Sequence, residues 1–219
     1  MLLRSLALVV PLALTAGCAN SAEVAPTTGG QVLASASAWT LYQGSTSPSP
    51  TASWTPDAVA TGTFLPFRPG STAITYDPAV VPPGATATVE IQQRTQTMEV
   101  RLVAAGLVPR RAYGAHLHTK PCTALPAEAG PHYQHQKDPA AVTSPPSVNP
   151  AYANPANEVW LDFTVDGSGE ASASSVLTWT FPPGTPARSL ILHAETTKTA
   201  PGVAGSAGKR VACMTLPQP

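Results

Sequence analysis

The chain has 219 residues, of which 25 are proline and 11% are charged, and its formal net charge is zero. This length allows one core of ordinary size, and abundant proline with few charged residues favours strands and turns over long surface helices. A net charge of zero argues against a nucleic-acid-binding protein that relies on an extended basic surface.

The first 18 residues have the features of an export signal. One basic residue, Arg4, precedes an apolar run from Leu6 to Leu14, and small residues follow before Cys18. The run is too short for a stable membrane span and predicts a secretory signal. The ending "TAGC" resembles a bacterial lipobox, so we expect a lipid anchor at Cys18 on the outer face of a bacterial cell membrane. Simple secretion is the alternative, because Thr15 stands where leucine is usual.

Export makes the three cysteines informative, because an oxidising compartment permits disulfides. With Cys18 assigned to the lipobox, Cys122 and Cys213 remain as a pair that closes a long loop. The chain-entropy model gives such a link a stabilisation of about 4 kcal/mol. Two free buried thiols are the alternative.

Residues 19–70 are predicted to be a largely disordered tether between the anchor and a folded domain. In the segment "STSPSPTASWTP" at 45–56, ten of the twelve residues are serine, threonine or proline. Such a composition cannot bury a core. Whether the segment "FLPFRP" at 64–69 packs on the domain is left open.

Residues 71–219 show the two-residue period of β-strands. In "ATATVEIQQ" the apolar residues Ala87, Val89 and Ile91 alternate with polar ones, and "TQTMEVRLV" alternates likewise, so the two runs predict a hairpin. Six further strands are predicted, at 71–76, 112–118, 157–165, 174–181, 189–194 and 210–216. Eight short strands and no convincing helix predict an all-β fold, either a Greek-key antiparallel β-sandwich or a flattened eight-stranded barrel. Residues 119–156 and 195–209 are expected to form two long functional loops.

The five histidines have an unusual distribution along the chain. The stretch "GAHLH" contains His116 and His118, and residues two apart in a strand point to the same face. His132 and His135 lie in the long segment that follows, and His193 ends an apolar strand. A His-x-His strand, a loop histidine and a histidine at the end of another strand can meet at one metal ion.

This order of motifs resembles the copper/zinc superoxide dismutase family over about residues 85–216. "GAHLH" resembles the family's copper strand, "AGPHY" the segment with the histidine that bridges copper and zinc, "LILHA" the strand with the last copper histidine, and "GKRVAC" the closing motif with the active-site arginine and disulfide cysteine. The resemblance implies copper-dependent dismutation of superoxide to dioxygen and hydrogen peroxide. The residues that it implies are the copper ligands His116, His118, His132 and His193, the catalytic residues Arg210 and His132, and the disulfide between Cys122 and Cys213.

The zinc site of the family is incomplete in this chain. Beside the bridging histidine the family uses two further histidines and an aspartate, whereas only His135 remains here, with Asp138 as the nearby carboxylate. Two or three ligands fall short of a closed tetrahedral set, so we expect a copper-only variant with at most a weak second site at these two residues. A carboxylate such as Glu195 or Asp162 is then expected to hydrogen-bond the far nitrogen of His132.

The expected substrate is a small anion, and the sequence offers cations for it. Arg210 is a permanent cation with several donors, and Lys198 is expected to add to its field. Two other functions are kept as alternatives: a non-enzymatic copper-binding or copper-buffering lipoprotein of the same fold at the cell envelope, and an adhesive or structural β-domain. The expected partners are superoxide and the membrane, with no nucleic acid, and a homodimer is left open.

Overall fold

The structure is a computed structural model, and it describes residues 54–141 and 147–217. The described residues contain nine strands and one short 3-10 helix, η1. Their bounds are β1 Ala58–Thr63, β2 Ala73–Thr75, β3 Thr86–Gln93, β4 Met98–Ala105, β5 Ala112–His118, η1 Pro126–Ala129, β6 Phe163–Thr164, β7 Ala171–Leu177, β8 Ser189–His193 and β9 Arg210–Thr215.

The predicted signal at residues 1–18, the lipidation site Cys18 and most of the predicted tether lie outside the described residues. Within the described part of the chain, no helix has the length and apolar character needed to cross a membrane. Export and lipid anchoring therefore stay predictions.

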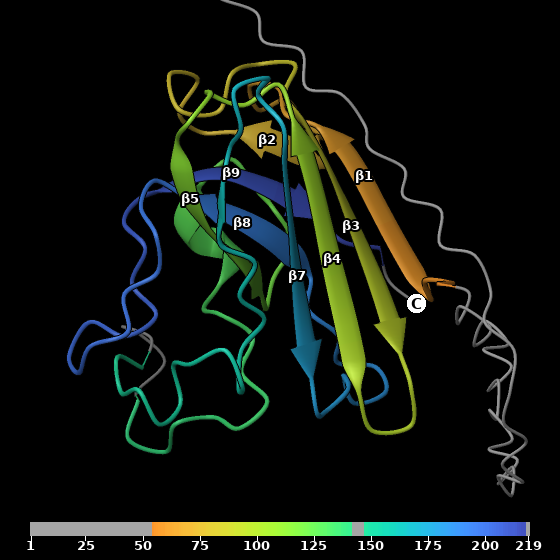
Figure 1. Cartoon of the computed structure of the whole chain (residues 1–219), viewed down its shortest axis with the longest axis vertical. Helices are drawn as coiled ribbons and strands as arrows, with labels where there is room; N and C mark the ends of the chain where they lie inside the picture. The colour runs from red at the N-terminus through yellow and green to blue at the C-terminus, as the bar shows by residue number, and fades with distance from the viewer. Residues whose placement is uncertain (1–53, 142–146, 218–219) are drawn as a thin grey trace, which may run out of the picture. The chain divides into compact units, whose positions relative to one another are not determined.

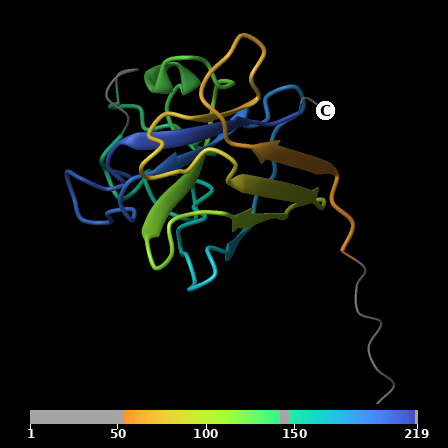
Figure 2. The same ribbon diagram turned by 90° about the horizontal axis from the view of Figure 1, so that it is seen from above.

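Two antiparallel sheets pack face to face as a sandwich (Figures 1 and 2). One sheet has the order β1-β3-β4-β7 and the other has the order β2-β9-β8-β5-β6. The chain crosses between the sheets after β4, returns after β6 and crosses again after β7, so that β7 pairs with β4 and β8 pairs with β5. This is Greek-key connectivity, and the predicted all-β class is confirmed.

The core lies between the two sheets and follows the predicted alternation. The predicted hairpin forms from β3 and β4, with Val89 opposite Leu102. Side chains from both sheets are almost fully buried in this core; they include Val89, Val100, Leu102, Tyr113, Leu117, Leu190 and Met214. Alternate residues of the same strands face away from it.

The folded domain begins earlier than residue 71, because β1 lies within the range predicted to be a tether. β1 buries only one hydrophobic residue, Ala60, and pairs through its backbone with β3. The backbone of Gly62 comes so close to the second sheet that a Cβ there would lie 2.6 Å from the Cβ of Ala73. Phe64 in "FLPFRP" is also fully buried. A strand of small residues with one buried position lacks a clear period-two pattern, so the sequence did not predict it.

Two other predicted strands differ from the observed ones. In the predicted strand 157–165 only Phe163 and Thr164 form β6, while Glu158 and Trp160 make isolated bridges. The predicted strand 174–181 is shifted to β7, because Trp179 packs against Tyr133 beyond the strand end. In both segments, side chains that alternate like a strand make loop contacts instead of extending a sheet.

Core burial in β4 gives a direct test of this fold. We expect Leu102→Ala to lower the free energy of unfolding by about 2–5 kcal/mol, because its side chain is 1% exposed and its loss leaves a cavity. The neighbouring Val103 is 57% exposed on the opposite face, so Val103→Ala should cost less than about 1 kcal/mol. Urea denaturation of both variants measures the difference; equal costs would contradict the assigned faces.

Candidate metal centre

β5 presents a different chemistry on each of its faces. Ala115 and Leu117 point into the core, while His116 and His118 lie on the opposite face. Both histidines are nevertheless 0% exposed. The strand therefore places two buried imidazoles outside the core of the sandwich.

Two further histidines complete a cluster with this pair. His193 ends β8, where it pairs with Gly114 of β5, and His132 bridges to His118. The four side chains each offer one ligand atom, and these atoms all lie within 4.8 Å of one another. Within residues 54–141 and 147–217, this is the one group of three or more His, Cys, Asp or Glu side chains with such geometry.

Hydrogen bonds to carbonyl groups set the tautomers of two of the histidines. The Nδ1 atom of His118 lies 2.9 Å from the carbonyl oxygen of Gly130, and that of His193 lies 3.4 Å from the carbonyl oxygen of Gly208. A carbonyl oxygen only accepts, so each Nδ1 carries the hydrogen. The Nε2 atom of each ring is left with a lone pair for a metal ion.

His116 has the opposite tautomer. Its Nε2 atom lies 2.6 Å from the hydroxyl oxygen of Thr197, and that hydroxyl donates its own hydrogen to Asp162 at 2.7 Å. The hydroxyl therefore accepts from Nε2–H, and the lone pair of His116 is on Nδ1. The backbone amide of Thr197 also donates to Asp162, so this bond joins the 195–209 loop to the metal centre.

The carboxylate that holds His132 is Glu158. Its Oε2 atom lies 2.8 Å from the Nδ1 atom of His132 and also accepts from Trp160, while Oε1 accepts from Gln134. Glu158 is only 2% exposed, so these three donors satisfy a carboxylate that water does not reach. The Nε2 atom of His132 is again left for a metal ion.

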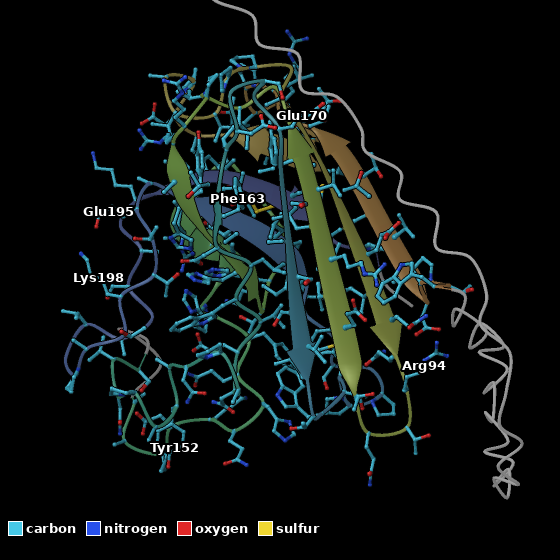
Figure 3. The ribbon with its side chains drawn as sticks, in the orientation of Figure 1. Arg94, Tyr152, Phe163, Glu170, Glu195 and Lys198 are labelled. Carbon is cyan, nitrogen blue, oxygen red and sulfur yellow. A yellow bond between two sulfur atoms is a disulfide. The ribbon has the colours of Figure 1, made fainter. Side chains whose placement is uncertain are left out.

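The expectation that Glu195 or Asp162 holds His132 was wrong. Asp162 lies on the His116 side of the centre, and Glu195 forms an ion pair with Lys198 at 3.0 Å. In Figure 3 these two charged side chains are labelled on the 195–209 loop, where both are about half exposed. The sequence did contain a signal for the role of Glu158, namely the two-residue spacing in "EVWLD". In an extended segment this spacing places Glu158 and Asp162 on the same side as Trp160.

Burial lowers the affinity of three of these histidines for protons. Burial first, and the neighbouring histidines second, lower the pKa of His116 and of His118 well below the usual value. Burial likewise lowers the pKa of His193 to about 3. These three imidazoles are therefore neutral near pH 7, which is the form that binds a metal ion.

The residues present fit a copper ion. Three of the lone-pair atoms, Nδ1 of His116 and Nε2 of His118 and His193, are buried without a hydrogen-bond partner among the described residues. Unpartnered buried acceptors that converge on one point are costly unless a cation lies between them. Imidazole nitrogen is a ligand that copper binds well in both of its biological oxidation states.

Arg210, at the start of β9, is held beside the cluster by backbone carbonyls. Its guanidinium donates to the oxygens of Pro126 at 2.8 Å and Gly130 at 2.7 Å. The same Gly130 oxygen accepts from His118, so one carbonyl connects the cation with a histidine of the cluster. Burial lowers the pKa of Arg210 from its usual value.

The disulfide between Cys122 and Cys213 closes the loop that supplies these carbonyls. The structure joins the two residues across a sequence separation of 91, as predicted. Ile191 and Ala129 are buried with Cys213 in a small second core. This core holds the loop of η1 against the outer face of β8 and β9.

His135 and Asp138 do not join a metal cluster in the described residues. The ring of His135 stacks on Trp179 with centroids 4.9 Å apart. Asp138 accepts hydrogen bonds from Ser147 and the amide of Ala140, which closes its own loop. Both residues of the predicted weak second site therefore make other contacts. Zinc binding at this site stays untested.

Comparison with known proteins identifies the family. The model of the copper/zinc superoxide dismutase family matches residues 85–216, and the chain belongs to this family. The predicted resemblance and the predicted enzyme class, superoxide dismutase, are confirmed at this level. No curated protein matches the chain.

Two solved structures illustrate the distance to known relatives. The copper/zinc superoxide dismutase from Brucella abortus has 19% sequence identity and a TM-score of 0.44, and the match covers 73% of this chain and 98% of that one. A double mutant of a superoxide dismutase-like protein from Bacillus subtilis has 17% identity and a TM-score of 0.41, with coverage of 59% and 88%.

The lowered histidine pKa values predict how pH acts on the metal-free protein. Below about pH 6.5 the unfolded chain takes up protons on histidines that stay neutral in the folded state, so the free energy of unfolding should fall as pH falls. Each such histidine contributes up to about 1.4 kcal/mol per pH unit, and for His193 the effect ends near its folded pKa of about 3.

Urea denaturation of chelator-treated protein between about pH 7.5 and about pH 5 measures this slope. His193→Gln should make the slope shallower. Equal stability of the parent protein across the range would contradict the neutral, buried state of His116, His118 and His193.

Proposed function

We propose that this protein dismutates superoxide to dioxygen and hydrogen peroxide at a copper ion held by His116, His118, His132 and His193. The observation that carries the proposal is the convergence of four lone pairs, each fixed by a hydrogen bond on the far side of its ring. Copper would supply the one-electron chemistry: one superoxide would lose an electron and leave as dioxygen, and a second would gain an electron and take up two protons to leave as hydrogen peroxide.

His132 differs from the other three histidines because a carboxylate holds it. The bond from Nδ1 to Glu158 keeps the ring in place whether or not Nε2 is bound to a metal. Its side chain is 9% exposed, whereas that of His116 is fully buried. His132 is therefore suited to hold a proton at Nε2 and pass it toward a reduced oxygen species.

Arg210 would attract and orient the substrate. Its guanidinium is fixed by carbonyls and is a permanent cation, so superoxide gains an attractive field without a change in the protein. Lys198 was expected to add to this field, but its exposed ion pair with Glu195 offsets that charge. We therefore assign the guiding role to Arg210 alone.

We also propose that the centre is copper-only. In the family, zinc binds the far nitrogen of the bridging histidine, and here the carboxylate of Glu158 is bonded to that nitrogen of His132. Three donors hold Glu158 in this position. The protein thus has an internal group that orients His132 without a second metal ion.

Metal analysis tests this part of the proposal. Protein purified without chelators and loaded with both metals should retain about one copper per chain and little zinc, because the described residues offer a single four-histidine group. The measurement is elemental analysis after gel filtration. Tightly bound stoichiometric zinc beside copper would rule out the copper-only assignment.

Substitution of Arg210 separates catalysis from copper storage. Arg210→Ala should keep its copper, because a guanidinium has no lone pair to offer, but should lose roughly tenfold or more of its dismutation rate and most of its dependence on ionic strength. Arg210→Lys, which keeps a charge, should retain part of the rate. His116→Ala should lose copper and activity together.

The assay compares each variant with an equal amount of free copper. If the parent protein binds copper but dismutates no faster than the free ion, and Arg210→Ala behaves like the parent, the protein stores copper instead.

We further propose that the domain is attached to the outer face of a bacterial cell membrane through a lipid on Cys18. The disulfide is consistent with an exported protein, since such bonds persist in oxidising compartments. Cys18→Ser should move the protein from the membrane fraction to the soluble fraction of expressing cells. Retention of that variant in washed membranes would contradict a lipid anchor.

A further inference from the structure

A cleft of about 750 Å³ lies between the 131–141 loop and the 182–188 loop. It shares His132 with the metal centre, whereas His116, His118, His193 and Arg210 do not line it. Its volume falls within the range of small-molecule binding sites. The proposed dismutase activity does not require this space.

The walls of the cleft carry an excess of positive charge. Three permanent cations line it, Lys120, Lys137 and Arg188, against the single carboxylate of Asp138. That carboxylate is engaged by hydrogen bonds from Ser147 and the amide of Ala140. Since the whole chain has a net charge of zero, an excess of two positive charges in one cleft is a local feature.

Arg188 also has an unsatisfied donor. Its Nε atom is buried and has no hydrogen-bond partner among the described residues. Its backbone is held on both sides, because its amide donates to His118 at 2.8 Å and its carbonyl accepts from Leu216 at 2.9 Å. A charged donor on a fixed backbone that lacks a partner is stabilised when an anion binds nearby.

The rings of Tyr133 and His135 line another part of the cleft wall, and each packs on a buried aromatic residue behind it. His135 lies parallel to Trp179 with an interplanar angle of 7°, and Tyr133 packs edge-on against Phe181. Both loop residues are also fixed by their amides, which donate to the carbonyls of Asn157 and Leu117. These rings are held before any ligand arrives, so they offer a preformed surface for a ring-shaped group.

We propose that this cleft binds an organic phosphate that carries a ring, of the class of a sugar phosphate. The phosphate group would lie against Arg188 and the two lysines, because guanidinium and ammonium groups are the usual donors to phosphate. The ring would lie against Tyr133 and His135, which explains why the cleft is larger than inorganic phosphate requires. This inference does not depend on the proposed dismutase function.

Calorimetric titration of the purified full chain with glucose 6-phosphate, glucose and inorganic phosphate tests the proposal. We expect glucose 6-phosphate to bind more tightly than inorganic phosphate, glucose not to bind, and the affinity to fall with rising salt. Arg188→Gln should weaken the binding of glucose 6-phosphate at least tenfold, and Lys137→Gln, at an exposed position, should weaken it less.

Arg68→Gln is the matched control, because it removes the same charge from an exposed position in the loop between β1 and β2. That loop and the loop before β8 lie at opposite ends of the four-stranded sheet in Figure 1. A circular dichroism spectrum and a urea unfolding midpoint equal to those of the parent protein would show that Arg188→Gln is folded. No binding of glucose 6-phosphate, or an equal loss of affinity in Arg68→Gln and Arg188→Gln, would overturn the site. Equal affinity for glucose 6-phosphate and inorganic phosphate would overturn the role of the aromatic wall.

Discussion

The alternation of side chains along β5 is the constraint on which the metal centre depends. Ala115 and Leu117 are buried in the sandwich, and this packing sets the rotation of the strand about its axis. His116 and His118 must then share the opposite face. A shift of one residue in the pairing of β5 with β8 would turn both imidazoles into the core and move His193 away from them. Hydrophobic packing on one side of the sheet therefore determines how the histidines of the metal centre are placed on the other side.

The cluster also shows how a protein can hold four imidazoles in fixed orientations. Each ring uses one nitrogen for a protein acceptor and keeps the other for the centre. Two of the acceptors depend on carboxylates from one extended segment: Glu158 binds His132 directly, and Asp162 acts on His116 through Thr197. A single short stretch of chain thus supports two neighbouring histidines of the centre, whose ring centroids lie 4.1 Å apart.

The loop closed by the disulfide has a similar orienting role for Arg210, the residue that we propose guides the substrate. Its small core of Ile191, Ala129 and Cys213 holds it on the outer face of the sheet, and its carbonyls hold Arg210. The carbonyl of Gly130 accepts from both Arg210 and His118. Movement of this loop would displace Arg210, the proposed guiding cation, and disturb His118, a proposed copper ligand, together, which explains why a covalent link in this place is valuable.

The sequence by itself determined the features that depend only on residues close together in the chain. The hairpin of β3 and β4, the two faces of β5 and the order of histidine, arginine and cysteine motifs follow from a period of two and from short spacings. Only the tertiary structure decided that β1 belongs to the sheet, that Glu158 holds His132, and that cations from separate loops meet in one cleft. The physical reason is that alternation tells which face of a strand is buried, whereas the path of an irregular loop has no period. The contact between His132 and Glu158, or between His116 and Thr197 81 residues away, is set by that path alone.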